Sequence, residues 1–159
     1  MAVDYFLKIE GIKGESTDSK HKEEIDVESW SWGETQVGAS GGHGGGAGAG
    51  KVSMQDFTFT MQTNKASPTL MLACATGQHI KEATLSARKA GGEQQDYLKI
   101  VMQDLIIANF QLGASNEIPR DQVAINFSKI SFEYKEQKPD GTLGSPVKTG
   151  YDLKANKKI

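Results

Sequence analysis

Residues 25–62 read IDVESWSWGETQVGASGGHGGGAGAGKVSMQDFTFTMQ, and this stretch decides the fold class. Both of its ends alternate apolar and polar side chains with period 2, which is typical of half-buried β-strands. Between those ends, eight glycines crowd into Gly38–Gly50. The glycine-rich segment therefore joins strand to strand. It predicts a long flexible loop on a β scaffold, where a loop more often makes contacts than catalyses.

The two flanking segments each have an apolar face and a small polar face. In Ile25–Gly33 the two tryptophans share a face, and the alternation slips by one residue before them, where a β-bulge fits. In Lys51–Gln62 the phenylalanines share a face and the threonines take the other. The residues that we expect in the barrel core are Trp30, Trp32, Phe57, Phe59 and Phe127.

The rest of the chain adds mostly strands. Val3–Glu10, Ala83–Ala90, Tyr97–Leu112, Gln122–Glu136 and Val147–Leu153 have strand-like patterns, and the two longest change their apolar phase part of the way along. One helix is predicted, with Ser67 as its N-cap, Pro68 at its first position and Gly77 as its stop. Long strands that change phase bend from one sheet into another. We therefore expect a single domain over residues 1–159, mainly β, built as a closed or nearly closed antiparallel barrel with one flanking α-helix.

The outer face of the first two segments has two interpretations. If the segments pair, Ser29, Ser31, Thr58 and Thr60 point away from the core. These side chains are either ordinary solvated strand residues or a smooth, small, uncharged surface on which other proteins dock. The sequence pattern leaves both open.

Two segments have the spacing of catalytic or cofactor-binding motifs, but the residues around them do not fit those motifs. Gly45–Lys51 has the spacing of a phosphate-binding loop, but Val52 follows where a magnesium-holding Ser or Thr is needed, and a strand follows in place of a helix. Gly38–Gly42 has the spacing of a nucleophile elbow without the helix after it. The three histidines lack neighbours at metal-ligand spacing and are interpreted as surface or loop residues. We therefore predict no enzyme activity and no catalytic, cofactor-binding or metal-binding residues.

Composition restricts the class of partner and the compartment. The formal net charge of the 159-residue chain is -2 with interspersed signs, which does not favour nucleic-acid binding, and no apolar run favours membrane insertion. The single cysteine, Cys74, predicts assembly in a reducing compartment. The first residues lack the pattern of a cleaved signal peptide, so if this protein leaves the cell, it does so by a route without one.

Three ordered blocks resemble the haemolysin-coregulated protein (Hcp) family. They are Gly14–Gly33, Ala66–His79 and Arg88–Leu98, and the glycine-rich segment stands in its expected place between the first two. The likeness runs from about Met1 to Tyr151. It implies a phage tail-tube-like β-barrel that assembles into homohexameric rings. The rings stack into the inner tube of the type VI secretion system, a contractile injection machine of Gram-negative bacteria used in virulence and bacterial competition.

The resemblance also implies partners and a route. A spike protein caps the tube, a contractile sheath surrounds it and drives it out, and small effectors travel in its lumen. The chain would assemble in the bacterial cytoplasm and then be secreted, and its end at Ile159 implies a plain structural member. On this basis Ser29, Ser31, Thr58 and Thr60 are candidates for lumen and effector contact. The candidates for ring stacking are Gly38, Gly41, Gly42, His43, Gly44, Gly45, Gly46, Gly48 and Gly50. The competing hypothesis is a monomeric ligand-binding β-barrel with both tryptophans in its pocket.

Overall fold

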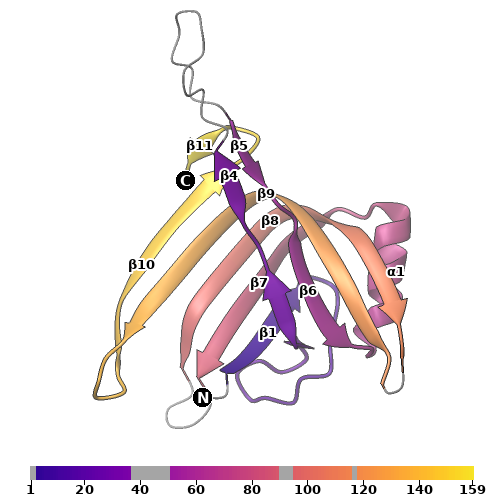
Figure 1. The fold of residues 1–159 in the computed structure, drawn as a ribbon, viewed down its shortest axis with the longest axis horizontal. Helices are drawn as coiled ribbons and strands as arrows, with labels where there is room; N and C mark the ends of the chain where they lie inside the picture. Colours follow the sequence, from indigo (N-terminus) through magenta and orange to yellow (C-terminus); the bar gives the residue numbers. More distant parts are fainter. Residues whose placement is uncertain (1–2, 37–50, 90–94, 116–117) are drawn as a thin grey trace, which may run out of the picture.

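A computed structural model describes residues 3–36, 51–89, 95–115 and 118–159. Across these ranges the chain forms eleven strands and one helix (Figure 1). In chain order they are β1 (Val3–Ile9), β2 (Ile25–Val27), β3 (Ser29–Ser31), β4 (Glu34–Gln36), β5 (Val52–Met54), β6 (Phe57–Gln62), α1 (Ala66–Thr76), β7 (Ile80–Lys89), β8 (Asp96–Gly113), β9 (Arg120–Gln137), β10 (Leu143–Asp152) and β11 (Lys157–Lys158).

The strands form a mainly antiparallel, barrel-like sheet. Its order is β11-β10-β9-β8-β7-β1-β2, and β6 joins it by pairing β9, with β3 on the other side of β6. The ladder of strands is not closed, because β2 and β3 are separate strands. They are nevertheless consecutive in the chain, separated only by Glu28, whose backbone N–H donates to the Thr60 carbonyl at 2.9 Å. The strand order β2-β1-β7-β8-β9-β6-β3 therefore begins and ends with two strands, β2 and β3, that follow each other in the chain.

The two longest strands, β8 and β9, belong to both the barrel and an extension of it. The first part of β9 pairs β6, and its second part pairs β10, which projects to the left in Figure 1. The register between β8 and β9 shifts between Ile107 and Asn109, and Asp104 has a positive φ of 52°. These irregularities lie near the predicted change of apolar phase in β8. They bend the strand, so its two halves take part in different walls.

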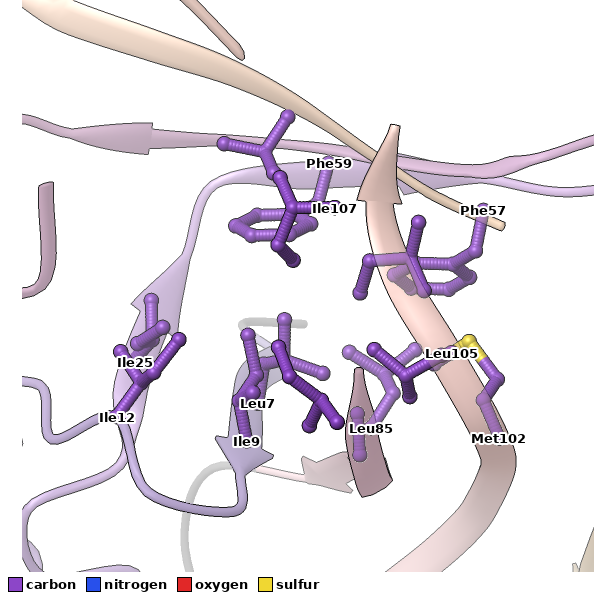
Figure 2. Close-up of a cluster of buried hydrophobic side chains, with 14 of the residues drawn as sticks. Leu7, Ile9, Ile12, Ile25, Phe57, Phe59, Leu85, Met102, Leu105 and Ile107 are labelled. Atoms are coloured by element: carbon purple, nitrogen blue, oxygen red, sulfur yellow. The ribbon is translucent and has the colours of Figure 1, made fainter. Parts of the chain in front are cut away.

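The core fills the space that these strands enclose. Phe57 and Phe59 of β6 are fully buried, and Figure 2 shows them packed over Leu7, Leu85 and Ile107. Alternate residues of β9, such as Val123 and Ile125, face the same interior. Since every second side chain of a strand points inward, the apolar alternation in the sequence gives the core directly.

Helix α1 ends where expected but begins earlier. Gly77 has a left-handed φ of 62°, and its N–H bonds the Cys74 carbonyl, which is a glycine C-cap. The prediction of Ser67 as N-cap is wrong, because Ser67 lies in the first turn. The Asn64 side-chain oxygen accepts from the Ala66 N–H at 2.8 Å instead. Pro68 is tolerated in the first turn of α1, because the backbone N–H groups of that turn have no helical partner.

Three strand predictions need correction. Lys51–Gln62 forms two strands, β5 and β6, and β5 pairs β4 in a separate two-stranded sheet. The last strand, β10, begins at Leu143 and is longer than predicted. The short β11 at Lys157–Lys158 was not predicted. Across the described ranges, the helix is too short to span a membrane.

Candidate functional site

The four small polar residues singled out in the sequence lie together. Ser29 of β3 stands opposite Thr60 of β6, and Ser31 stands opposite Thr58. The hydroxyl oxygens of Ser29 and Thr60 are 2.5 Å apart. Both serines are exposed and both threonines are half-buried. The two segments therefore pair, and their hydroxyl side chains form one surface on the side of the sheet that faces away from the core.

The same surface continues across two further strands. Thr60 is in register with Gln122 of β9, which is in register with Gln111 of β8. In the next row, Thr58 is in register with Ala124, which is in register with Asn109. We call the surface formed by these four strands the uncharged face; its residues are Ser29, Ser31, Thr58, Thr60, Asn109, Gln111, Gln122, Ala124 and Asn126.

Charges occur only at the borders of the uncharged face. At one end Arg120 pairs with Glu28, with 3.0 Å between Nε and Oε1. At the other end the Asn126 side-chain amide donates to Asp56 at 2.9 Å. Four strands spaced about 4.8 Å apart give the uncharged face a width of roughly 15 Å. An open concavity of about 610 Å³ lies over Ser29, Thr60 and Gln122 at the Arg120 end of the face. The face is too neutral to attract nucleic acid, and its uncharged side chains suit contact with the surface of a protein.

Sequence reasoning missed the part of the uncharged face that β8 and β9 contribute. Gln122 and Ala124 were inside a predicted strand, but nothing in the pattern showed that this strand pairs with β6. In β8, the irregularity before Asn109 shifts the alternation. Only the register of the folded sheet brings these amides beside the serines and threonines.

The two tryptophans lie at the margin of the core, not in its centre. The Trp30 ring stacks on Phe57 with centroids 5.9 Å apart and meets Tyr5 edge-on. Trp32 packs near Phe127, which is buried, and its indole Nε1 is buried without a hydrogen-bond partner among the described residues.

Trp32 also lines an open groove of about 800 Å³ between the β4–β5 pair and the β9–β10 pair. Its apolar lining includes Val52, Met54, Phe132 and Tyr151, with Glu34 and Lys158 as its charged residues. Phe132 remains 38% exposed. We call this feature the lateral groove.

His21 lies in the loop between β1 and β2, as expected, but its side chain is buried. Its Nδ1 lies 3.0 Å from both carboxylate oxygens of Glu24, and its Nε2 lies 3.0 Å from Asp96. The ring stacks on Phe6 with centroids 4.4 Å apart. Asp96 is 75 residues away in the chain, so short-range spacing gave no sign of this contact.

The His21 cluster holds residues 11–24 against the outside of β1. Gly14 is needed there, because a Cβ at that position would lie 2.5 Å from the Glu24 carbonyl oxygen. Across the residues that the structure describes, no group of three His, Cys, Asp or Glu side chains is arranged so that it could hold a metal ion, the His21 cluster included. The His21 arrangement therefore supports structure and gives no reason to assign chemistry.

The proposed stacking residues between Gly38 and Gly50, including His43, lie outside the described residues. The described chain shows only what flanks them, the paired strands β4 and β5.

Comparisons with known proteins agree on one family. Residues 6–134 match the model of the family described as "Type VI secretion system effector, Hcp". The chain is 50% identical to Protein hcp1 of Pseudomonas aeruginosa over 160 residues, with 98% of each chain covered. It superposes on the crystal structure of Hcp1 from Salmonella typhimurium with a TM-score of 0.84, at 41% identity and full coverage of both chains. A structure described as a type six secretion system protein gives a TM-score of 0.92 at 26% identity, covering 99% of this chain and 100% of the other.

Proposed function

Since the chain belongs to the Hcp family and is a structural tube protein of the type VI secretion system, not an enzyme, we propose that six copies close into a ring whose bore is lined by the uncharged face. Small effector proteins would contact this surface as they travel. The observation that carries the proposal is the row-by-row register of small neutral side chains across β3, β6, β9 and β8. Such a surface lets varied cargo pass without strong electrostatic capture.

The edges of the uncharged face support ring closure. At one edge, the described contacts of β3 pair it only with β6. At the other edge, the pairing of β8 with β7 ends at Leu105, so the rest of β8 pairs only with β9 in the described chain. A closed ring uses two different surfaces of each subunit. Pairing the β8 edge of one copy with the β3 edge of the next would continue the sheet around the bore and cover both exposed edges.

Ring stacking is assigned to the glycine-rich segment. The residues proposed are Gly38, Gly41, Gly42, His43, Gly44, Gly45, Gly46, Gly48 and Gly50. Ordering a chain rich in glycine costs more conformational entropy than ordering other residues, so stacking contacts made by it would be weak and reversible.

The family of this protein indicates its partners and its route out of the cell. Membership implies secretion by the type VI system and contact with its components. The finer assignment is part of our proposal. It comprises a spike protein at the tube end, a contractile sheath around it, effectors in the bore, assembly in the bacterial cytoplasm and secretion without a cleaved signal peptide.

The alternative of a monomeric ligand-binding barrel has less support. Such a barrel needs an interior pocket lined by the tryptophans. In the described interior, Trp30 stacks on Phe57, and fully buried side chains such as Phe59 and Met61 fill the space beyond it.

Electron microscopy with a site-specific label tests both parts of the proposal. In a Cys74→Ala background, a Ser31→Cys variant is labelled with a maleimide-linked gold cluster and imaged by negative stain. We expect rings with gold inside the central hole. A Lys13→Cys variant, labelled in the same way on the exposed segment outside β1, should carry gold outside the hole. Rings with the Ser31→Cys label at the rim contradict the bore assignment, and small particles without holes contradict ring closure.

A further inference from the structure

Helix α1 has the composition of a buried helix but lies at the surface. Ala66–Thr76 contains no charged residue. Ala66, Leu70 and Ala73 are buried against the barrel, while Met71 and Leu72 on the other side are 53% and 56% exposed. A surface helix normally carries polar or charged residues on its outer face, and a helix that is apolar on all sides is normally covered. The outer face of α1 therefore has the character of a contact surface.

The lateral groove is a second apolar surface without a partner in the described chain. Trp32, Met54 and Phe132 give it an apolar lining, and its volume of about 800 Å³ has room for several side chains. The groove is formed by β4, β5, β9 and β10. In Figure 1, β10 and α1 lie at opposite ends of the horizontal axis of the molecule.

The strand order places the two surfaces at opposite edges of the uncharged face. Helix α1 contacts β8, beside the end of that strand in Figure 1. The lateral groove begins at Trp32, the residue directly after β3. When the β8 edge of one copy meets the β3 edge of the next, α1 of the first copy approaches the lateral groove of the second.

We propose that α1 of each subunit docks in the lateral groove of its neighbour in the ring, with Met71 and Leu72 as the side chains that enter it. This inference rests on the proposed ring and names its lateral contact. The partner is a second copy of this chain, because the two unpartnered apolar surfaces are different and lie at opposite edges of the same molecule. A heterologous contact that closes into a ring needs two such surfaces.

The distribution of charge agrees with this docking. Among the described residues, the groove is lined by two charged residues, Glu34 and Lys158, which have opposite signs, and α1 has none. The docked helix therefore buries no charge of its own, which would otherwise cost free energy.

A disulfide test between two different chains examines the contact directly. One chain carries Leu72→Cys and the other carries Val52→Cys, both in the Cys74→Ala background and with tags of different size. The chains are mixed, allowed to exchange and oxidised. We expect a disulfide-linked heterodimer in the ring fraction on a non-reducing gel. A matched control replaces Leu72→Cys with Lys13→Cys, which is exposed on residues 11–24 outside β1, and should give no linkage with Val52→Cys.

A charge variant gives an independent measurement. Leu72→Glu places a carboxylate on the outer face of α1, and we expect at least a tenfold loss of rings in favour of folded monomers by light scattering. Lys13→Glu, on the exposed segment outside β1, should leave the rings unchanged. Unchanged rings in Leu72→Glu, with no Leu72–Val52 linkage, overturn the docking while leaving the proposed ring intact, and point to another component of the secretion system as the partner of α1. If the unaltered protein forms no rings at all, the proposed function and this inference both fail.

Discussion

Arg88 is the residue whose burial most needs a partner. Its guanidinium is buried, and it donates to both oxygens of Asp18, at 2.8 and 2.5 Å. Its Cζ also lies 4.9 Å from the centre of the Phe6 ring. The hydrogen bonds from Arg88 hold the pKa of Asp18 well below its usual range, and Asp18 in turn raises the pKa of Arg88. This pair fastens residues 11–24 to β7.

Asp18→Asn should lower the melting temperature by several degrees at neutral pH, because a buried guanidinium loses its nearest counter-charge and keeps only Asp4, at 3.6 Å. Since the pKa of Asp18 is lowered by folding, its contribution is present above the unfolded value of about 4 and is lost as the pH falls below it. The melting temperatures of the two proteins, measured from pH 7 downward, should therefore become equal in acid. A constant difference at every pH would contradict the assignment.

The pKa of Asp26 shifts in the opposite direction from that of Asp18, so Asp26 has the opposite effect on the pH dependence of stability. Desolvation by the surrounding chain, together with the negative charges of Asp4, Asp18 and Glu15, raises the pKa of Asp26. Its ionised form is therefore unfavourable in the folded state at neutral pH, and the penalty disappears as the pH falls below about 4.

Asp26→Asn should raise the melting temperature at pH 7 and change it little at pH 3. Asp140→Asn is the matched control, since hydrogen bonds from Thr142 lower the pKa of Asp140, and that variant should not gain stability. A loss of stability in Asp26→Asn at pH 7 would show that Asp26 makes a favourable contact.

At the scale of single residues, the sequence allowed the fewest predictions. His21 looked isolated because one of its carboxylate partners, Asp96, lies 75 residues away, across the β7–β8 pair. The fully buried Phe57 and Phe59 could be predicted, because period-2 alternation acts between near neighbours in the chain. Long-range polar contacts have no such local pattern.

Among the elements, α1 depends on a buried carboxylate at its start. Asp121 of β9 is buried and accepts hydrogen bonds from Thr63, at 2.8 Å, and from the Ser67 hydroxyl. The Ser67 oxygen also accepts from the Asn64 backbone N–H at 3.0 Å. Ser67 thus joins the helix to the barrel, a different task from the N-cap that its position in the sequence suggested.

Ser67→Ala should destabilise the protein by about 1–3 kcal/mol, because it leaves the buried Asp121 carboxylate with one donor fewer. Urea unfolding measures the loss. The exposed Thr69→Ala in the same helix is the control and should have a much smaller effect. Equal losses in the two variants would show that helix propensity, and not the contact with Asp121, decides the result.

Strands could be predicted where one of their faces is apolar, and only there. Glu34, Thr35 and Gln36 of β4 are all exposed, so the sequence showed no alternation, and the strand exists because β5 pairs with it. The same holds for β11, whose two lysines are exposed and pair with the end of β10. Pairing with a partner strand, not local preference, creates these elements.

At the scale of the whole molecule, β8 and β9 connect the two kinds of surface. Each strand has 18 residues. The later part of β8 and the earlier part of β9 carry the uncharged face, and the later part of β9 lines the lateral groove. The proposed bore and the proposed lateral contact are therefore built on the same two strands.

Deleting Gly41–Gly48 should leave rings intact and reduce the formation of stacked tubes. The deletion removes most of the proposed stacking residues but none of the strands that form the barrel. Electron microscopy at high protein concentration counts rings and tubes in both proteins. Tubes of equal number and length in the deleted protein would show that stacking uses other residues.

The overall architecture could be predicted in outline, and the surfaces only in part. Alternation and phase changes indicated long bent strands in a barrel-like sheet with one helix. The lateral groove could not be predicted, because it brings Trp32 and Val52 together with Phe132, which lies 100 residues after Trp32 in the chain. Sheet register across the fold determines such a surface, and a single sequence does not contain it.

The bare outer face of α1 also has a consequence for the time before assembly. A newly made subunit exposes Met71 and Leu72 to every other protein in a crowded cell. Exposed apolar patches of this kind favour aggregation as readily as correct association. We therefore expect subunits that have not entered a ring to aggregate more readily than subunits within one.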